Sequence, residues 1–434
     1  MSNRYVAATH LRLGRLYRVL LVFWFPALAI GASILTPRNF DNDVGGGPAG
    51  VATSGALFAY RLSVALVLAT SVALTWYAHS GFPSRASRGG TNVLGLAIGV
   101  FFLAKLTSYL LGAVATTPLI GLFVEAWFWL ALVFFTHAIN TERIIEYVRS
   151  GICIVLYASL LAAIFAPQWA VQHGYELSML GISSRLHGAV AHANVLGPLA
   201  ALYLVSYGTK IPLSSSAQFL KWLLAFSVLI ATQSKTSLVG LVAGWIVCAL
   251  SRVERRRFLR TLIVGMILAS AGYMVLDIQD AVDWIVAEAP REMTTATGRL
   301  QIWLVTLSVW QDAPWFGYGQ DLWKSEMQEE YVRLLGWYVP HAHNILIQAL
   351  GAEGVFGFVA TSGLFAAMVR AAWLVRGQCT QVSGMVAFVV IVNMFEVGFT
   401  GAMRFSATPL VLFVAINAWK ESLSWGHRNT QIQA

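Results

Sequence analysis

The sequence predicts an all-α, polytopic membrane protein, and three properties of the chain lead to that fold class. Of its 434 residues, 57% are hydrophobic and only 11% are charged, whereas ordinary soluble domains carry roughly 25% charged residues. Apolar runs long enough to cross a bilayer recur along the chain. The 16 Trp and 14 Tyr match the aromatic enrichment of membrane interfaces. The lipid bilayer is therefore the first partner that we expect.

About twelve runs reach the roughly 20 mostly apolar residues that a transmembrane helix needs. The first, residues 16–35, follows a basic flank and has no convincing cleavage site after it, so we expect a retained helix rather than a signal peptide. The centres of the predicted helices are Phe25, Val67, Phe102, Trp129, Leu156, Ala200, Leu224, Leu241, Ile267, Phe358, Val390 and Phe413. No internal repeat is evident, which predicts a single membrane domain over residues 1–434.

The basic residues predict how these helices are oriented. The net charge of +9 could suggest nucleic acid in a soluble protein. Here most of the Lys and Arg residues fall in alternate connections between apolar runs, as the positive-inside rule requires. The strongest cytoplasmic anchor is "SRVERRRFLR", residues 251–260, after the eighth run. Both termini are therefore predicted to be cytoplasmic, and no nucleic-acid partner is expected.

One connection is much longer than the others. Residues 277–342 form a predicted outer, periplasmic loop, and unstructured loops of that length are uncommon in compact domains. The loop contains the tryptophans Trp284, Trp303, Trp310, Trp315, Trp323 and Trp337. Within it "GRLQIWLVTLSVW" has an amphipathic, helical pattern, which predicts a short helix on the membrane surface, and the turn signal "APWFGYG" follows.

Metal and cofactor chemistry find no support in the sequence. Cys153, Cys248 and Cys379 lie in or beside apolar runs without metal-ligand spacing, so we expect packing residues. No HExxH, paired-cysteine or aspartate-rich pattern occurs, and "GYGQD" lacks the context of a dinucleotide fingerprint. The expectation is chemistry without a metal or a cofactor.

Polar groups precede the sixth, eighth and tenth predicted helices, which all start on the outer side. They are Arg185, His187, His192 and Asn194 before the sixth, Lys235 at the eighth, and His341, His343 and Asn344 at the tenth, with Arg299 in the long loop. Cations beside helix N-termini form an anion site, since the helix dipole and unpaired N–H groups add to their charge. The predicted ligand is a phosphate or diphosphate. Alternatively, the cations are anchors that snorkel to lipid headgroups.

His341 and His343 are separated by one residue. On a helix their side chains would therefore point about 200° apart, and only one could face a common site. His343 is the better candidate because the following residues continue as helix, and a neutral imidazole can act as a general base. The alternative is a polar residue that satisfies the helix end. His187 and His192 are expected to be packing or hydrogen-bonded residues.

Charges and glycines within the apolar runs are also informative. Glu353 and Glu396 lie in or near spans, where an ionisable group is by default functional or paired, for example with Arg404. The glycines of "GAEGVFG", residues 351–357, predict a face that packs closely against another helix.

Five motifs in order resemble the superfamily of O-antigen ligases and Wzy-type polysaccharide polymerases, and within it most closely the ExoQ-type exopolysaccharide polymerases. They are "RLHGAVAHANVLG", "SKTSLV", "TGRLQIW", "PWFGYG" and "HAHNILIQALGAEGVFG", spanning residues 185–357. The resemblance implies a multi-helix bundle with one large periplasmic loop in the bacterial inner membrane. It does not extend to the N-terminal third beyond helical character.

The resemblance also implies an activity. Members of the superfamily transfer a glycan en bloc from undecaprenyl diphosphate to an acceptor hydroxyl. By resemblance, Arg185 and Arg299 hold the donor diphosphate and His343 assists deprotonation of the acceptor. His341, Asn344 and Asn194 are expected to contact substrate, as is Lys235, which stands where the family often has arginine and offers a point charge instead of a bidentate fork. Backside attack would invert the anomeric configuration.

Three functions remain open at this point. The motifs favour a polymerase, whose acceptor is another lipid-linked glycan. An O-antigen ligase would instead use lipid A-core as the acceptor. A transporter of a lipid-linked or anionic solute is the alternative outside the enzymes, but it would be expected to show repeats and charges near the membrane midplane.

Overall fold

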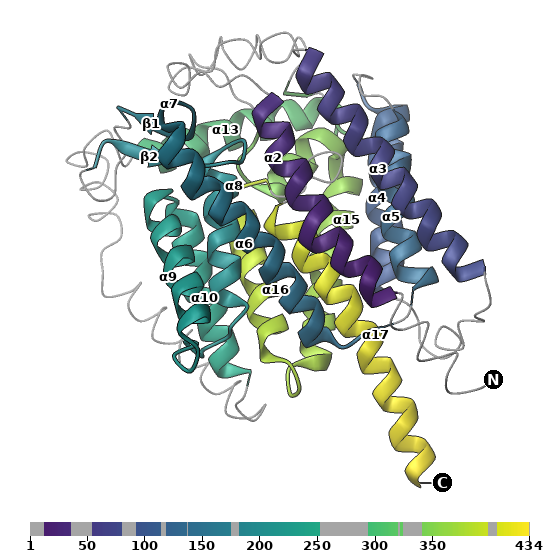
Figure 1. Cartoon of the computed structure of the whole chain (residues 1–434). Helices are drawn as coiled ribbons and strands as arrows, with labels where there is room; N and C mark the ends of the chain where they lie inside the picture. Colours follow the sequence, from purple (N-terminus) through teal and green to yellow (C-terminus); the bar gives the residue numbers. More distant parts are fainter. Residues whose placement is uncertain are drawn as a thin grey trace, which may run out of the picture.

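The chain forms a bundle of helices (Figure 1). The structure, a computed structural model, describes residues 13–35, 54–79, 93–113, 119–136, 138–174, 182–251, 294–319, 322–323, 341–397 and 406–433. The first half of the bundle contains η1 (Val19–Trp24), α2 (Phe25–Leu35), α3 (Ser54–His79), α4 (Val93–Leu111), α5 (Leu119–Phe135) and α6 (Thr141–Phe165). The second half contains α8 (Ala193–Val205), α9 (Ser216–Ala231), α10 (Lys235–Leu250), α15 (Ile345–Val375), α16 (Thr380–Asn393) and α17 (Ala407–Gln433).

The all-helical character of the bundle is confirmed. Four helical segments are long and apolar enough to span a membrane, namely Leu13–Gly31, Val93–Leu111, Thr141–Phe165 and Ile345–Val375, and several shorter apolar helices accompany them. The predicted centre at Ile267 lies outside the described residues, and every other predicted centre falls within a described helix. The total of about twelve spans stays a prediction.

Large apolar side chains cover much of the outside of the bundle. Leu96, Leu110 and Ile120 are each more than 60% exposed, and soluble monomers rarely expose extended apolar surface. Together with the apolar helices, this surface identifies a multi-pass membrane protein.

Helix α8 forms the centre of the second half of the bundle. It packs against α6, α9, α10, α16 and α17, and its side chains from Leu199 to Leu204 are almost completely buried. A helix that is apolar on all sides is either buried in a core or exposed to lipid, and α8 is buried by its neighbours. Cys153, Cys248 and Cys379 are also buried and form no disulfide in the described part of the chain, as expected for packing residues.

Helix α15 is broken at Gly354, and this corrects the expected role of that glycine. Gly351 does lie against another helix, since a Cβ there would be 2.6 Å from Thr306 of α13. Gly354 has φ +67° and non-helical geometry. The segment 313–319 fills the break: Val355 N donates to Pro314 O (2.8 Å), and Tyr318 N donates to Gly351 O (3.0 Å). A Cβ on Gly354 would lie 2.3 Å from the Trp315 backbone. At the break, Gly354 therefore admits a loop backbone rather than a neighbouring helix.

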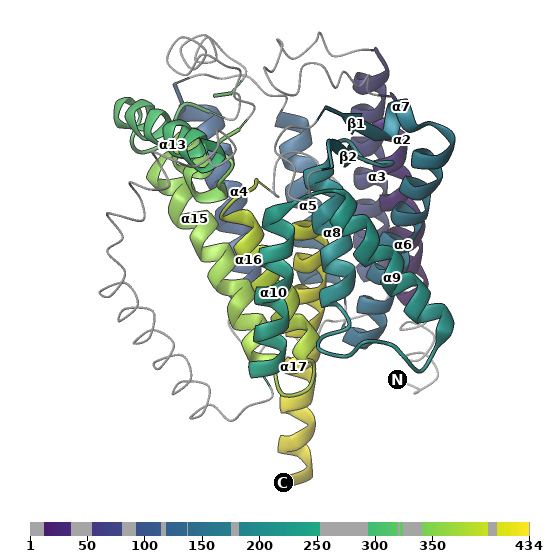
Figure 2. The same cartoon turned by 90° about the vertical axis from the view of Figure 1, so that its left-hand side faces the viewer.

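The region of the predicted outer loop contains the expected helix. Helix α13 (Thr294–Asp312) lies across the end of the bundle near the start of α15 (Figure 2). It forms a small core of its own with the segments that follow, made of Ile302, Val309, Leu322, Trp323 and Ala342. Two further expectations for α13 stay predictions: that it lies at the membrane surface, and that it lies on the periplasmic side.

Candidate functional site

A short hairpin carries Arg185 into the bundle. Strand β1 (Val171–His173), after the one-turn helix α7 (Pro167–Ala170), pairs antiparallel with β2 (Ser184–Leu186), so that Arg185 lies opposite Gln172. Arg185 is only 7% exposed. Its Nε donates to Thr232 O at 2.9 Å, and its Nη2 donates to Asn194 Oδ1. Arg185 thus links the hairpin to the turn before α10 and to the start of α8.

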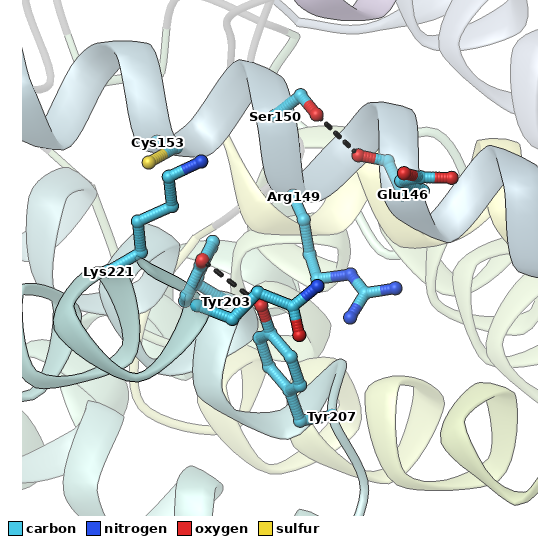
Figure 3. A pocket seen from close by; sticks show the side chains of 8 residues that line it. Glu146, Arg149, Ser150, Cys153, Tyr203, Tyr207 and Lys221 are labelled. Carbon is cyan, nitrogen blue, oxygen red and sulfur yellow. Dashed lines mark hydrogen bonds between the residues drawn. The ribbon is translucent and has the colours of Figure 1, made fainter. Parts of the chain in front are cut away.

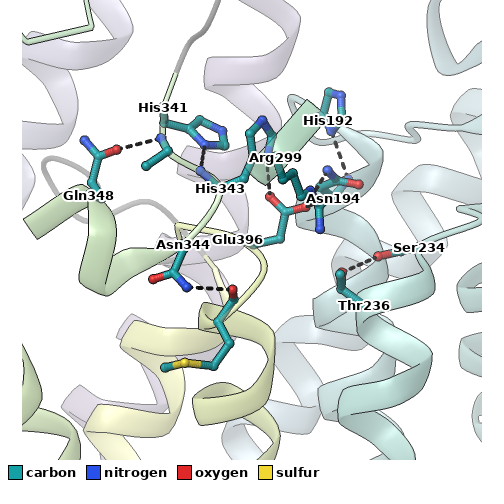
Figure 4. A network of polar contacts seen from close by, with 12 residues as sticks. His192, Asn194, Ser234, Thr236, Arg299, His341, His343, Asn344, Gln348 and Glu396 are labelled. Carbon is teal, nitrogen blue, oxygen red and sulfur yellow. Dashed lines mark hydrogen bonds and ion pairs between the residues drawn. The ribbon is translucent and has the colours of Figure 1, made fainter. Parts of the chain in front are cut away.

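Glu396, just beyond the end of α16, connects four segments of the chain (Figure 4). Asn194 Nδ2 donates to its Oε1 at 2.8 Å, and Arg299 Nη2 lies 3.4 Å from the same oxygen. The other oxygen, Oε2, lies 3.6 Å from His343 Nδ1. The carboxylate therefore brings the predicted residues Arg299, His343 and Asn194 together, with Arg185 directly behind Asn194.

The two histidines of "HAHN" lie in a turn, not on a helix, which corrects the expected 200° separation. Helix α15 begins at Ile345, and the Asn344 side chain caps it by accepting from Leu346 N (2.9 Å) and Ile347 N (3.1 Å). His343 has φ +51°. The rings of His341 and His343 are 4.1 Å apart, and His343 N donates to His341 Nδ1 at 3.2 Å. Both imidazoles can therefore face one site.

Contacts from two other elements hold this turn in place. Ala342 N donates to Gln348 Oε1 (2.9 Å), and Trp303 Nε1 donates to Ala342 O (2.8 Å). Asn344 Nδ2 donates to Met394 O at 3.0 Å. Trp303 lies one turn after Arg299 on α13, so a single face of that helix supports the turn and reaches Glu396. The motif "TGRLQIW" thus contributes both a cation and a support.

Backbone strain gathers at the same place. Among the described residues, the non-glycine positions with positive φ are His343 and Gln233, each at +51°. Gln233 is 4% exposed, and its Nε2 donates to Ile182 O (2.9 Å) and Ser184 O (2.6 Å), next to Arg185. Such conformations cost of the order of 1–3 kcal/mol and cluster at functional sites. The strain supports the choice of this cluster as the candidate site.

The electrostatics of Glu396 favour its ionised form. Burial raises the pKa of this carboxyl, but His343, His341 and Arg299 more than offset burial, so the pKa lies below its ordinary value of 4.5. The carboxylate is thus available at neutral pH as a negatively charged partner for the imidazole of His343.

The remaining predicted residues lie around this centre. Lys235 is the exposed first residue of α10, and within the described ranges it forms no ion pair or hydrogen bond. His187 Nε2 lies 3.1 Å from Gln172 Oε1, and His192 Nδ1 accepts from Asn194 N at 3.0 Å. The two rings contact each other with centroids 4.9 Å apart. His187 and His192 therefore have the hydrogen-bonded, structural placement that the sequence indicated.

Sequence reasoning did not include Glu396 among the site residues, although it identified the carboxylate as functional or paired. Its partners here are His343, Arg299 and Asn194, and the suggested partner Arg404 lies outside the described residues. The available signal was an ionisable residue directly after an apolar run. The other such carboxylate, Glu353, forms an ion pair with Lys105 of α4 at 2.6 Å.

His341, His343 and Glu396 each offer a ligand atom, and these atoms lie within 4.8 Å of one another. Two imidazoles and a carboxylate suit a divalent cation. However, Arg299 and Asn194 already contact Glu396, and the guanidinium charge 3.4 Å away opposes a second cation. The set fits an imidazole beside a carboxylate better than a metal centre.

The fold and the site define a multi-pass membrane protein with a cationic, histidine-bearing cluster where the N-termini of α8, α10 and α15 meet. A family model described as O-antigen ligase matches residues 220–362, which include Lys235, Arg299 and the "HAHN" turn. A Pseudomonas aeruginosa protein named O-antigen ligase is 25% identical over 287 residues, or 64% of this chain. The matched region spans just under two thirds, 66%, of that relative. Over these regions the chain is similar to the O-antigen ligase family.

Proposed function

We propose that the protein is a membrane glycosyltransferase that moves a glycan en bloc from a lipid diphosphate carrier to an acceptor hydroxyl. The observation that carries this proposal is the placement of His343 Nδ1 3.6 Å from Glu396 Oε2, beside the Arg299 guanidinium. A base and a cation in one cluster are what such a transfer requires: one removes the proton of the acceptor, and the other stabilises the departing diphosphate.

His343 is the proposed general base. At 3.6 Å, His343 Nδ1 is slightly too far from Glu396 Oε2 for a hydrogen bond. If substrate binding closes this gap, the carboxylate would hold the imidazole proton on Nδ1 and leave Nε2 as the proton acceptor. No hydrogen bond to His343 Nε2 occurs in the described part of the chain, and the side chain is 23% exposed. A sugar hydroxyl is too weak an acid to ionise beforehand, so the proton would move to Nε2 as the hydroxyl oxygen attacks the anomeric carbon.

The cations have different proposed roles because their exposure differs. Arg299 is 26% exposed and Lys235 is exposed, so both can reach a diphosphate. Arg185 is buried and already donates to Thr232 and Asn194, which supports a role in positioning. Its direct contact with the donor rests on the family resemblance. As the anomeric carbon gains the acceptor oxygen, its bond to the phosphate oxygen breaks with inversion, and the lipid diphosphate leaves with that electron pair.

The acceptor is a finer part of the proposal. The motifs "HAHN" and "TGRLQIW" favour a polymerase, which extends one lipid-linked glycan with another. The names of the matching family and of the Pseudomonas aeruginosa relative favour a ligase, for which lipid A-core would be the acceptor. We place the donor, undecaprenyl diphosphate, and the site on the periplasmic side of the inner membrane, in agreement with the predicted topology.

Replacement of His343 tests the chemistry directly. His343→Asn is the variant of choice because asparagine tolerates positive φ and cannot take up a proton at neutral pH. The expected loss is about 10²- to 10⁴-fold in the rate of glycan transfer by the purified protein in liposomes. His173→Ala, which removes an exposed histidine in β1, is the matched control and should transfer normally. Normal transfer by His343→Asn would overturn the proposal.

Deletion of the gene distinguishes the two acceptors. Surface glycans and carrier lipid would be separated on gels from the deletion strain and from a complemented strain. Loss of long polymer with single repeats still attached to the acceptor would indicate a polymerase. Intact polymer that accumulates on the carrier lipid would indicate a ligase.

A further inference from the structure

A second polar pocket lies between α6, α8 and α9, away from the candidate active site (Figure 3). Its volume is about 120 Å³, roughly four times the ~30 Å³ that a water molecule occupies in the liquid. The residues that line it are Glu146, Arg149, Ser150, Cys153, Tyr203, Tyr207, Gln218 and Lys221. The pocket has room for one small polar group, such as a phosphate.

The two cations that line this pocket, Arg149 and Lys221, are placed so that they could bind an anion. The Arg149 guanidinium stacks on the Tyr207 ring at 4.5 Å, which orients its planar fork. Arg149 Nε is buried and has no hydrogen-bond partner, and buried donors are rarely left unsatisfied. The Lys221 side chain extends into the pocket beside Cys153 (Figure 3). In the described part of the chain, neither cation forms an ion pair, not even with the Glu146 carboxylate.

The pocket is distant from the cluster around Glu396. Arg149 precedes the end of α6, where the Arg185 hairpin begins, by 16 residues, from 149 to 165, which is roughly 24 Å at 1.5 Å per residue. Lys221 precedes Thr232, the Arg185 partner, by 11 residues, or roughly 16 Å. The hydrocarbon core of a bilayer is about 30 Å thick. An anion in this pocket would therefore come from the leaflet opposite the candidate active site.

The surface next to the pocket suits lipid chains. Leu220 and Leu223 flank Lys221 on α9 and are 63% and 43% exposed, and Tyr157 and Leu161 are exposed further along α6. The charged pocket suits the phosphate group of a phospholipid, and the exposed apolar side chains beside it suit the acyl chains. We propose that this pocket binds the phosphate group of an anionic phospholipid, with Arg149 and Lys221 as its ligands and the acyl chains on α6 and α9.

A lipid titration followed by native mass spectrometry tests this site on the full chain in neutral detergent. Phosphatidylglycerol should bind more tightly than phosphatidylcholine. Lys221→Gln should weaken phosphatidylglycerol binding about tenfold, the value of one charge-assisted hydrogen bond, and the double variant Arg149→Gln/Lys221→Gln should weaken it further. Because Lys221 is exposed, its replacement should leave folding intact.

Arg143→Gln is the matched control, since Arg143 is an exposed cation on the same helix that does not line the pocket. It should bind phosphatidylglycerol like the unmodified chain. An equal loss in Arg143→Gln and Lys221→Gln, or equal binding of the two lipids, would overturn the proposal. Inorganic phosphate is the second arm: displacement of the lipid at millimolar phosphate would show that the pocket takes a free phosphate as readily as a headgroup, and failure to displace it would support the lipid.

Discussion

Two carboxylates near apolar helices, Glu353 and Glu396, are held in very different ways. Glu353 forms one short ion pair, 2.6 Å, with Lys105, and its side chain is 4% exposed. Glu396 is shared by Asn194, Arg299 and His343 at distances from 2.8 to 3.6 Å. The short ion pair of Glu353 joins α15 to α4. Several longer contacts, one of them to an imidazole, leave a carboxylate that can respond when a proton or a substrate arrives.

Removal of one partner from the tight pair should have the largest effect on stability. Glu353→Ala removes the carboxylate that lies 2.6 Å from the largely buried Lys105 ammonium, and breaking a buried ion pair is expected to cost about 3–5 kcal/mol in the free energy of unfolding. The measurement is denaturant unfolding in detergent. The double variant Lys105→Met/Glu353→Leu removes both charges and should recover most of the loss. If the single and double variants are equally unstable, the ion pair is not the cause.

The shared carboxylate should affect catalysis more than stability. Glu396→Gln keeps the shape of the side chain but removes the charge that orients His343, and hydrogen bonds to charged groups contribute about 1.5–3 kcal/mol. The rate of glycan transfer should fall by about 10- to 150-fold. An unchanged transfer rate in Glu396→Gln would contradict this role of Glu396.

The pH dependence of stability offers a smaller test of the same contrast. Because the pKa of Glu396 lies below its ordinary value of 4.5, the folded state is stabilised above that value. This stabilisation is lost as the pH falls through the lower, folded-state pKa. Thermal unfolding should therefore show a difference between the native chain and Glu396→Gln at neutral pH that shrinks in acid. A difference that grows in acid would contradict the assigned direction.

The smallest expected effect is that of a metal chelator. His341, His343 and Glu396 are close enough to bind a divalent ion, but the function proposed for His343 needs a free imidazole. Transfer in liposomes should be unchanged after dialysis against EDTA. Loss of transfer that zinc or magnesium restores would replace the acid–base assignment with a metal site.

The sequence predicts the helices well because each one carries its signal locally, in apolar runs and in the polar residues at their starts. Arg299, His343 and Asn344 were identified from motifs and do lie near one another. The role of Glu396 cannot be predicted from a local motif, because its partners His343 and Arg299 are distant from it in the sequence. The turn geometry of His341 and His343 was also missed: it depends on Trp303 and Gln348, and helical periodicity says nothing about residues before a cap.

The break at Gly354 makes α15 two helical pieces joined through the backbone of residues 313–319. The first piece carries the "HAHN" turn, so its direction depends on a segment that precedes it by some thirty residues. Helix α15 and the segment 313–319 are therefore expected to function only together. A chimera that takes α15 from a relative without its own 313–319 segment would receive a broken helix with nothing to bridge the gap, and its histidines would point away from their partners.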